Sequence, residues 1–113
     1  MKKILLVASI LAGSIAIVPT AQADNLSLRI CEYVQANDKN RLRSFLKQKR
    51  LKIRKIYSDL SCNGDNLLIF AAKSKSLEVG EFIIGKLPSK KVKAEIDNIA
   101  KYSAHLAEEA KDR

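Results

Sequence analysis

The residues with the widest chemical range are two cysteines, Cys31 and Cys62, and a single histidine, His105. A thiol redox site needs a Cys-x-x-Cys spacing, so that one thiol can resolve the other, whereas these cysteines are 31 positions apart. A zinc site needs four ligands, and His105 adds only one. In an oxidising compartment an isolated cysteine pair most often forms a structural disulfide, which is therefore the prediction.

The other polar residues do not form a catalytic pattern. His105 has Glu108 and Glu109 about one helical turn away, which is typical of a surface histidine. The sequence also lacks a glycine-rich phosphate loop, facing paired carboxylates and a metal cluster. We expect no enzymatic activity, no cofactor, no metal and no small-molecule substrate. The polar residues around Cys62 are those of a capped turn: Ser58, Asp59, Ser61 and Asp65.

Positive charge is concentrated in one stretch, which we call the basic segment, residues 39–55. The whole chain has 21 basic and 12 acidic residues. The basic segment holds nine of the basic residues and no acidic one, while the rest of the chain after residue 23 is nearly neutral. The nine are Lys39, Arg41, Arg43, Lys47, Lys49, Arg50, Lys52, Arg54 and Lys55.

A local cluster of cations raises the potential over one face and favours anionic partners. We expect these nine residues to bind an acidic protein or peptide. The alternative is peripheral association with anionic envelope lipid or lipopolysaccharide phosphates, with about 1 kcal/mol from each cation near a charged surface. A solvated, solubilising face is the third interpretation. Nucleic acid is not an expected partner, because the three tyrosines are too scattered to form a stacking platform: Tyr33, Tyr57 and Tyr102.

The N-terminus is typical of a secretory signal peptide, residues 1–23. Lys2 and Lys3 precede the uncharged apolar run 4–18, and Ala21-Gln22-Ala23 is a small-x-small cleavage pattern. The apolar run is shorter than the roughly 20 residues that span a bilayer. We expect cleavage after Ala23 and a periplasmic protein that begins at Asp24.

The sequence after residue 23 predicts helices and turns, which would position the cysteines and the basic segment. Apolar spacing predicts helices over residues 26–36, the start of the basic segment, 67–74 and 77–87. Residues 48–60 fit a short strand or a helical turn, and residues 62–65 predict a tight turn. We expect an all-α fold with two stacked helix pairs in a disulfide-linked domain, residues 24–88, and one amphipathic helix over residues 89–113.

The helix pairs repeat with an expected offset of 37 residues, which predicts stacked units. In this register Leu42, Phe45 and Leu46 correspond to Val79, Phe82 and Ile83. All six should be buried together with Leu68 and Ala71.

The second unit, residues 64–84, resembles an ankyrin repeat. It matches at Gly64, a polar residue at Asn66, Leu68, Ala71-Ala72, Glu78-Val79 and Phe82-Ile83-Ile84, and departs at Leu67, Ile69 and Lys75. The resemblance implies helix-turn-helix units.

A second resemblance spans most of residues 30–88, through the words at residues 30–43, 51–57, Cys62-Asn-Gly and 66–71. These words resemble a small family of exported Gram-negative proteins without an assigned function. The resemblance implies a periplasmic location and the cysteine pair, and it implies no activity.

Overall fold

The computed structural model describes residues 25–113, so the predicted signal peptide, residues 1–23, lies outside it. Within the described residues the chain is helical without a strand, and the all-α prediction is confirmed. A helix over residues 25–35 is followed by α2 (Lys39–Gln48), α3 (Ile53–Ile56), the 3₁₀ turn η1 (Tyr57–Asp59), α4 (Leu67–Lys73), α5 (Leu77–Lys86), α6 (Ser89–Ala94), α7 (Ile96–Ala100) and α8 (Ala104–Lys111).

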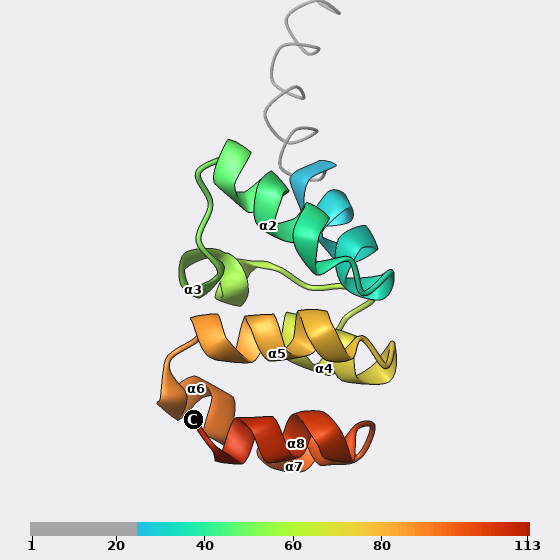
Figure 1. Cartoon of the computed structure of the whole chain (residues 1–113), viewed down its shortest axis with the longest axis vertical. Helices are drawn as coiled ribbons and strands as arrows, with labels where there is room; N and C mark the ends of the chain where they lie inside the picture. Colours follow the sequence, from blue (N-terminus) through green and yellow to red (C-terminus); the bar gives the residue numbers. More distant parts are fainter. Residues whose placement is uncertain (1–24) are drawn as a thin grey trace, which may run out of the picture.

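The helices stack in three layers (Figure 1). The helix of residues 25–35 and α2 form the first layer, α4 and α5 the second, and α7 and α8 the third. Helix α5 contacts α2 on one side and α8 on the other. One hydrophobic core runs through all three layers and includes Val34 and Leu42, Leu68 and Ile83, and Ile99 and Leu106.

The turns inside the first two layers are equivalent. Asn37 and Lys75 both adopt a left-handed backbone conformation, with φ of 56° and 58°. In each turn the next backbone N–H donates to a carbonyl five residues earlier, at 3.0 Å from Asp38 and 2.9 Å from Ser76. This hydrogen bond is one of the ways in which the last carbonyls of a helix are satisfied. The two layers therefore repeat with an offset of 38 residues, not the expected 37.

This one-residue difference explains one incorrect burial prediction. In the observed register Phe45 and Leu46 correspond to Ile83 and Ile84, and all four are buried. Phe82 does not correspond to a buried residue of the first layer, and it is partly exposed. The other seven residues expected in the core are buried as predicted: Leu42, Phe45, Leu46, Leu68, Ala71, Val79 and Ile83.

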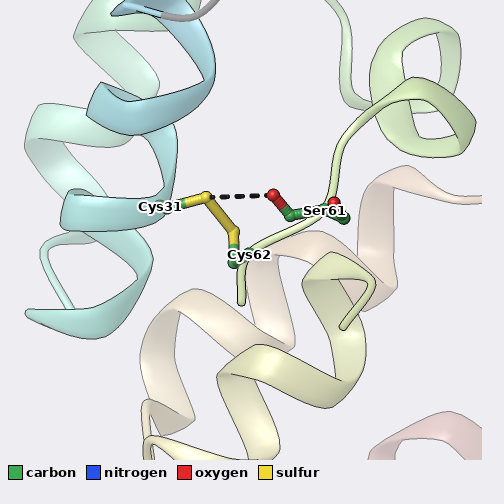
Figure 2. Close-up of a disulfide and its surroundings, with 3 residues drawn as sticks. All are labelled: Cys31, Ser61 and Cys62. Carbon is green, nitrogen blue, oxygen red and sulfur yellow. Dashed lines mark hydrogen bonds between the residues drawn. A yellow bond between two sulfur atoms is a disulfide. The ribbon is translucent and has the colours of Figure 1, made fainter. Parts of the chain in front are cut away.

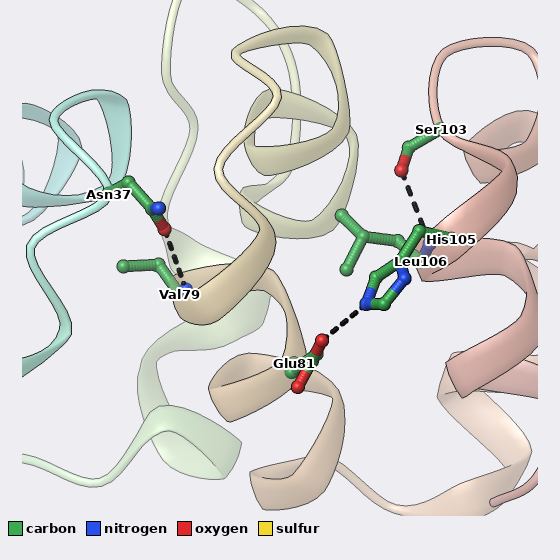
Figure 3. Close-up of polar contacts among 6 residues, drawn as sticks. All are labelled: Asn37, Val79, Glu81, Ser103, His105 and Leu106. Carbon is green, nitrogen blue, oxygen red and sulfur yellow. Dashed lines mark hydrogen bonds and ion pairs between the residues drawn. The ribbon is translucent and has the colours of Figure 1, made fainter.

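The first and second layers are joined by a side-chain cap. The Asn37 side-chain oxygen accepts a hydrogen bond of 3.0 Å from the backbone N–H of Val79, in the first turn of α5 (Figure 3). The Ser76 side chain does not cap its own helix and donates to the carbonyl of Gln35 in the first layer. A helix of the second layer thus receives its cap from the first layer.

The segment between the first two layers, for which residues 48–60 fitted either a short strand or a helical turn, forms helical turns. Ile53, Tyr57 and Leu60 are buried from α3, η1 and the residue after it. The predicted turn follows, with left-handed Asn63 and Gly64 at φ of 54° and 85°, as in the two-residue turns that Asn-Gly favours. Asn66 then caps α4 by accepting from the N–H of Ile69 at 2.9 Å.

Residues 89–113 were expected to form a single amphipathic helix, and the structure corrects this expectation to three helices. The main break comes before α8, where Ser103 adopts an extended conformation and its hydroxyl accepts from the N–H of Leu106 at 3.2 Å (Figure 3). Serine in this role begins a new helix and does not continue the previous one. Val92, Ile99 and Leu106 are fully buried, so these helices complete the core.

Close packing of the third layer depends on Gly80 in α5. A Cβ atom at this position would lie 2.6 Å from a Leu106 methyl carbon, and Leu106 is itself buried. The absence of a side chain lets α8 approach α5.

None of the helices within residues 25–113 combines the length and the apolar character needed to cross a membrane.

Candidate functional site

Cys31 and Cys62 form the predicted disulfide, with their Cα atoms 5.8 Å apart. The bond joins the helix of residues 25–35 to the turn before α4, and thus the first layer to the second (Figure 2). Cys62 is buried and Cys31 is partly exposed. The Cys31 sulfur also lies 3.7 Å from the carbonyl oxygen of Ser61; this is a contact without a hydrogen, because the sulfur is bonded. The pair serves as a covalent link and leaves no free thiol in the described chain.

The nine cations of the basic segment face solvent, as the sequence predicted, although Lys39 is only partly exposed. Leu42, Phe45 and Leu46 occupy the inward face of α2 and leave its basic residues outside. Among the described residues, Arg41 is the one member of the segment with an ion pair, at 3.4 Å from Asp38. In the three other ion pairs of the described residues, the acidic side chains pair with cations outside the basic segment.

The structure divides the basic segment. Arg41 and Lys49 line an open cavity beside Arg29, between α2 and the helix of residues 25–35. Lys39 lines a smaller cavity that also includes Glu78. Four others surround a second cavity, which we call the basic groove: Arg43, Lys47, Lys52 and Arg54. Arg50 and Lys55 do not line this groove.

The basic groove is lined by residues of α2, α3 and α5. Helix α3 and the C-terminal ends of α2 and α5 lie on the same side of the stack (Figure 1). Its volume is about 350 Å³. Its apolar lining comes from three elements and the loop between α2 and α3: Leu46, Leu51, Ile53 and Phe82. Leu46 and Ile53 are buried, whereas Leu51 and Phe82 keep part of their surface open to the groove. Within residues 25–113, this lining contains no aspartate or glutamate.

A fifth cation of the groove, Lys86, comes from the last turn of α5. Its ammonium nitrogen lies 5.7 Å from the centre of the Phe82 ring, within the range of a cation–π contact. The sequence did not indicate a binding role for Lys86 or Phe82, because both lie far from the basic segment along the chain and Phe82 was expected in the core. The signal that could have found them is the 38-residue repeat, which moves Phe82 out of the core register.

One family model matches residues 30–94 of the chain, and its description is "Protein of unknown function (DUF3718)". The chain belongs to this family. No curated protein and no solved structure matches it. The part matched to the DUF3718 family contains both cysteines, the whole basic segment and every residue that lines the basic groove.

His105 lies beyond the residues matched to the DUF3718 family and forms an ion pair with Glu81 of α5 (Figure 3). It is a surface histidine, as predicted, but its partner comes from the neighbouring layer. The hydrogen bond that the His105 imidazole donates to the Glu81 carboxylate raises the pKa of His105, and the negative charge of Glu109 adds to this effect.

The same three residues carry ligand atoms within 4.8 Å of one another, close enough to hold a metal ion. The ion pair already accounts for the position of His105 and Glu81, and all three side chains are on the surface. The expectation of no metal stays a prediction.

Tyr57 is the buried polar side chain without a hydrogen-bond partner in the described part of the chain. Burial raises the pKa of its hydroxyl far above the ordinary value, and the nearby charge of Glu95 acts in the same direction. The hydroxyl therefore holds its proton tightly.

Proposed function

We propose that the protein is a non-enzymatic binding module of the periplasm, which engages an acidic protein or peptide through the basic segment. Eight of the nine cations have no acidic partner within residues 25–113, and the ninth is paired with a residue next to the segment. Unneutralised cations on a protein surface attract anionic partners over several ångströms. The absence of acids in this segment is the observation that carries the proposal.

The periplasmic location is supported by the disulfide and by the leader-like residues 1–23. Disulfides form and persist in oxidising compartments and are rare where glutathione and thioredoxin keep thiols reduced. Mass spectrometry of the protein from cells should find Asp24 at the N-terminus. An intact Met1 in the membrane fraction would contradict this location.

Binding should depend on ionic strength. The probe is a fluorescein-labelled peptide of aspartate, glutamate and serine, titrated with the protein in the form that cells produce. Raising the salt from about 0.1 M to about 1 M shortens the screening length from about 10 Å to about 3 Å, and affinity should fall markedly.

The quadruple variant Arg50→Gln, Lys52→Gln, Arg54→Gln, Lys55→Gln should bind the acidic peptide roughly tenfold more weakly, because exposed ion pairs contribute up to about 1 kcal/mol each and not all four contact one peptide. All four side chains are exposed, so the unfolding midpoint should change little. A folded quadruple variant that binds as well as the parent would mean that the segment only solubilises the protein.

A further inference from the structure

The basic groove combines a rim of cations with an apolar floor. Five cations surround it, from α2, the loop after α2, α3 and α5. Beneath them lies an apolar floor in which Phe82 and Leu51 remain partly open to solvent. Binding sites of this size usually have an apolar lining with a few polar groups that fix orientation.

We propose that the basic groove binds an acidic peptide segment of a partner protein, with one large apolar side chain on the floor and flanking carboxylates against the rim. This inference rests on the proposed function and names the chemistry of the partner. The apolar side chain would cover the exposed parts of Phe82 and Leu51, and carboxylates before and after it would reach Lys52, Arg54 and Lys86.

The relative exposure of the cations and the apolar residues of the groove favours a peptide over a membrane. A protein that binds a bilayer places apolar side chains beyond its cations, so that they enter the headgroup region. The exposed large apolar side chains of the described chain, Leu28 and Leu77, do not line the groove. The apolar residues of the groove are buried or only partly exposed, whereas its five cations are exposed, so contact with the apolar lining needs a side chain that enters the groove.

Two helix ends reduce the electrostatic repulsion among the cations of the groove. Lys47 and Lys86 lie in the last turns of α2 and α5. The C-terminal end of a helix has a partial negative charge that favours a nearby cation. Neither residue forms an ion pair among residues 25–113, so both ammonium groups remain available to an anionic partner.

The test compares two labelled peptides of equal charge by fluorescence anisotropy. One is a short aspartate–glutamate peptide with a single central phenylalanine, and the other has glycine in place of the phenylalanine. The phenylalanine peptide should bind roughly tenfold more tightly, because a large apolar side chain leaves water on the floor of the groove. The Phe82→Ala variant should remove most of this difference and leave the glycine peptide unchanged.

Two charge variants provide a matched control. Lys52→Gln with Arg54→Gln removes two cations of the groove, and Arg50→Gln with Lys55→Gln removes two exposed cations from the same stretch outside it. The first pair should weaken the phenylalanine peptide roughly fivefold, and the second pair by less than about twofold. Unfolding midpoints of all variants check the fold, and Phe82→Leu, which keeps an apolar floor, replaces Phe82→Ala if the latter is unfolded.

The other outcomes reject either the groove inference alone or the proposed function together with it. If both peptides bind equally and the two charge pairs have equal effects, the groove is not the site, while binding of acidic peptides through the basic segment stands. If neither peptide binds and vesicles containing anionic phosphatidylglycerol do, both the groove inference and the proposed acidic protein partner are wrong. Absence of binding to peptides and vesicles also rejects both.

Discussion

At the scale of single residues, the side chains that reach across layers have the largest structural consequences. Asn37 caps α5 from the first layer, and His105 reaches from the third layer to Glu81 in the second. Neither partner is close in the sequence. Such contacts add to the apolar packing between layers and, between the first and second layers, to the disulfide.

The ion pair of His105 predicts a pH-dependent contribution to stability. Because Glu81 raises the pKa of His105 in the folded protein, the folded state holds the proton more tightly than the unfolded state. The contribution is fully present below the ordinary histidine pKa of about 6.5, and it is lost as the pH rises through the raised folded value.

Urea unfolding of the parent and His105→Gln at several pH values measures this contribution. The parent should be more stable than the variant at low pH, and the difference should shrink as the pH rises. An NMR titration of the imidazole should give a pKa above its value in a short peptide. A constant difference in unfolding free energy across the range would contradict the assignment.

At the scale of helices, the approach of α8 to α5 requires a residue without a side chain at one position. Gly80→Ala would place a methyl group 2.6 Å from a Leu106 methyl carbon. Overpacking of a core typically costs about 1–3 kcal/mol, against a gain of up to about 1 kcal/mol from helix propensity. We expect Gly80→Ala to lower the free energy of unfolding.

Gly85→Ala is the matched control in the same helix. A Cβ atom at Gly85 would meet nothing within 4 Å, so this substitution should be neutral or stabilise by up to about 1 kcal/mol. Urea unfolding of both variants should therefore give changes of opposite sign or clearly different size. Equal changes at the two positions would show that α8 adjusts freely.

Local patterns in the sequence predicted the elements of the first two layers well, because the apolar spacing, Asn66 and the Asn63-Gly64 turn act within a few residues. The basic segment was also predictable, since charge and an inward apolar stripe determine which side chains face solvent. The third layer was not. Val92, Ile99 and Leu106 fit one helical stripe, but the helix breaks at Glu95, between α6 and α7, and at Ser103, whose hydroxyl caps α8.

The groove could be predicted only in part. Its four cations from the basic segment were identified, but Phe82 of its floor and its fifth cation, Lys86, come from α5. Their position depends on how the second layer sits on the first, where a register of 38 instead of 37 decides whether Phe82 faces the core or the groove. Side-chain periodicity within one helix does not contain that information.

At the scale of the whole molecule, stability depends on a link between small layers. A domain of this size has a limited core and benefits from a covalent constraint. The disulfide joins residues separated by 31 positions and should stabilise by about 3–4 kcal/mol through the loss of unfolded-state entropy. Urea unfolding with and without dithiothreitol should show this difference, with Cys31→Ser, Cys62→Ser matching the reduced parent. Equal midpoints for the oxidised and reduced forms would contradict this role.

The disulfide has a further effect on the charges. The loop that it closes, residues 31–62, encloses the entire basic segment. In a linear chain, unfolding would let nine like charges move apart, and that relief of repulsion would favour the unfolded state. In the covalent ring the charges stay near one another even after the helices melt, so unfolding relieves less of their repulsion. The bond that links the layers thus lowers the electrostatic cost of keeping so many cations on one folded surface.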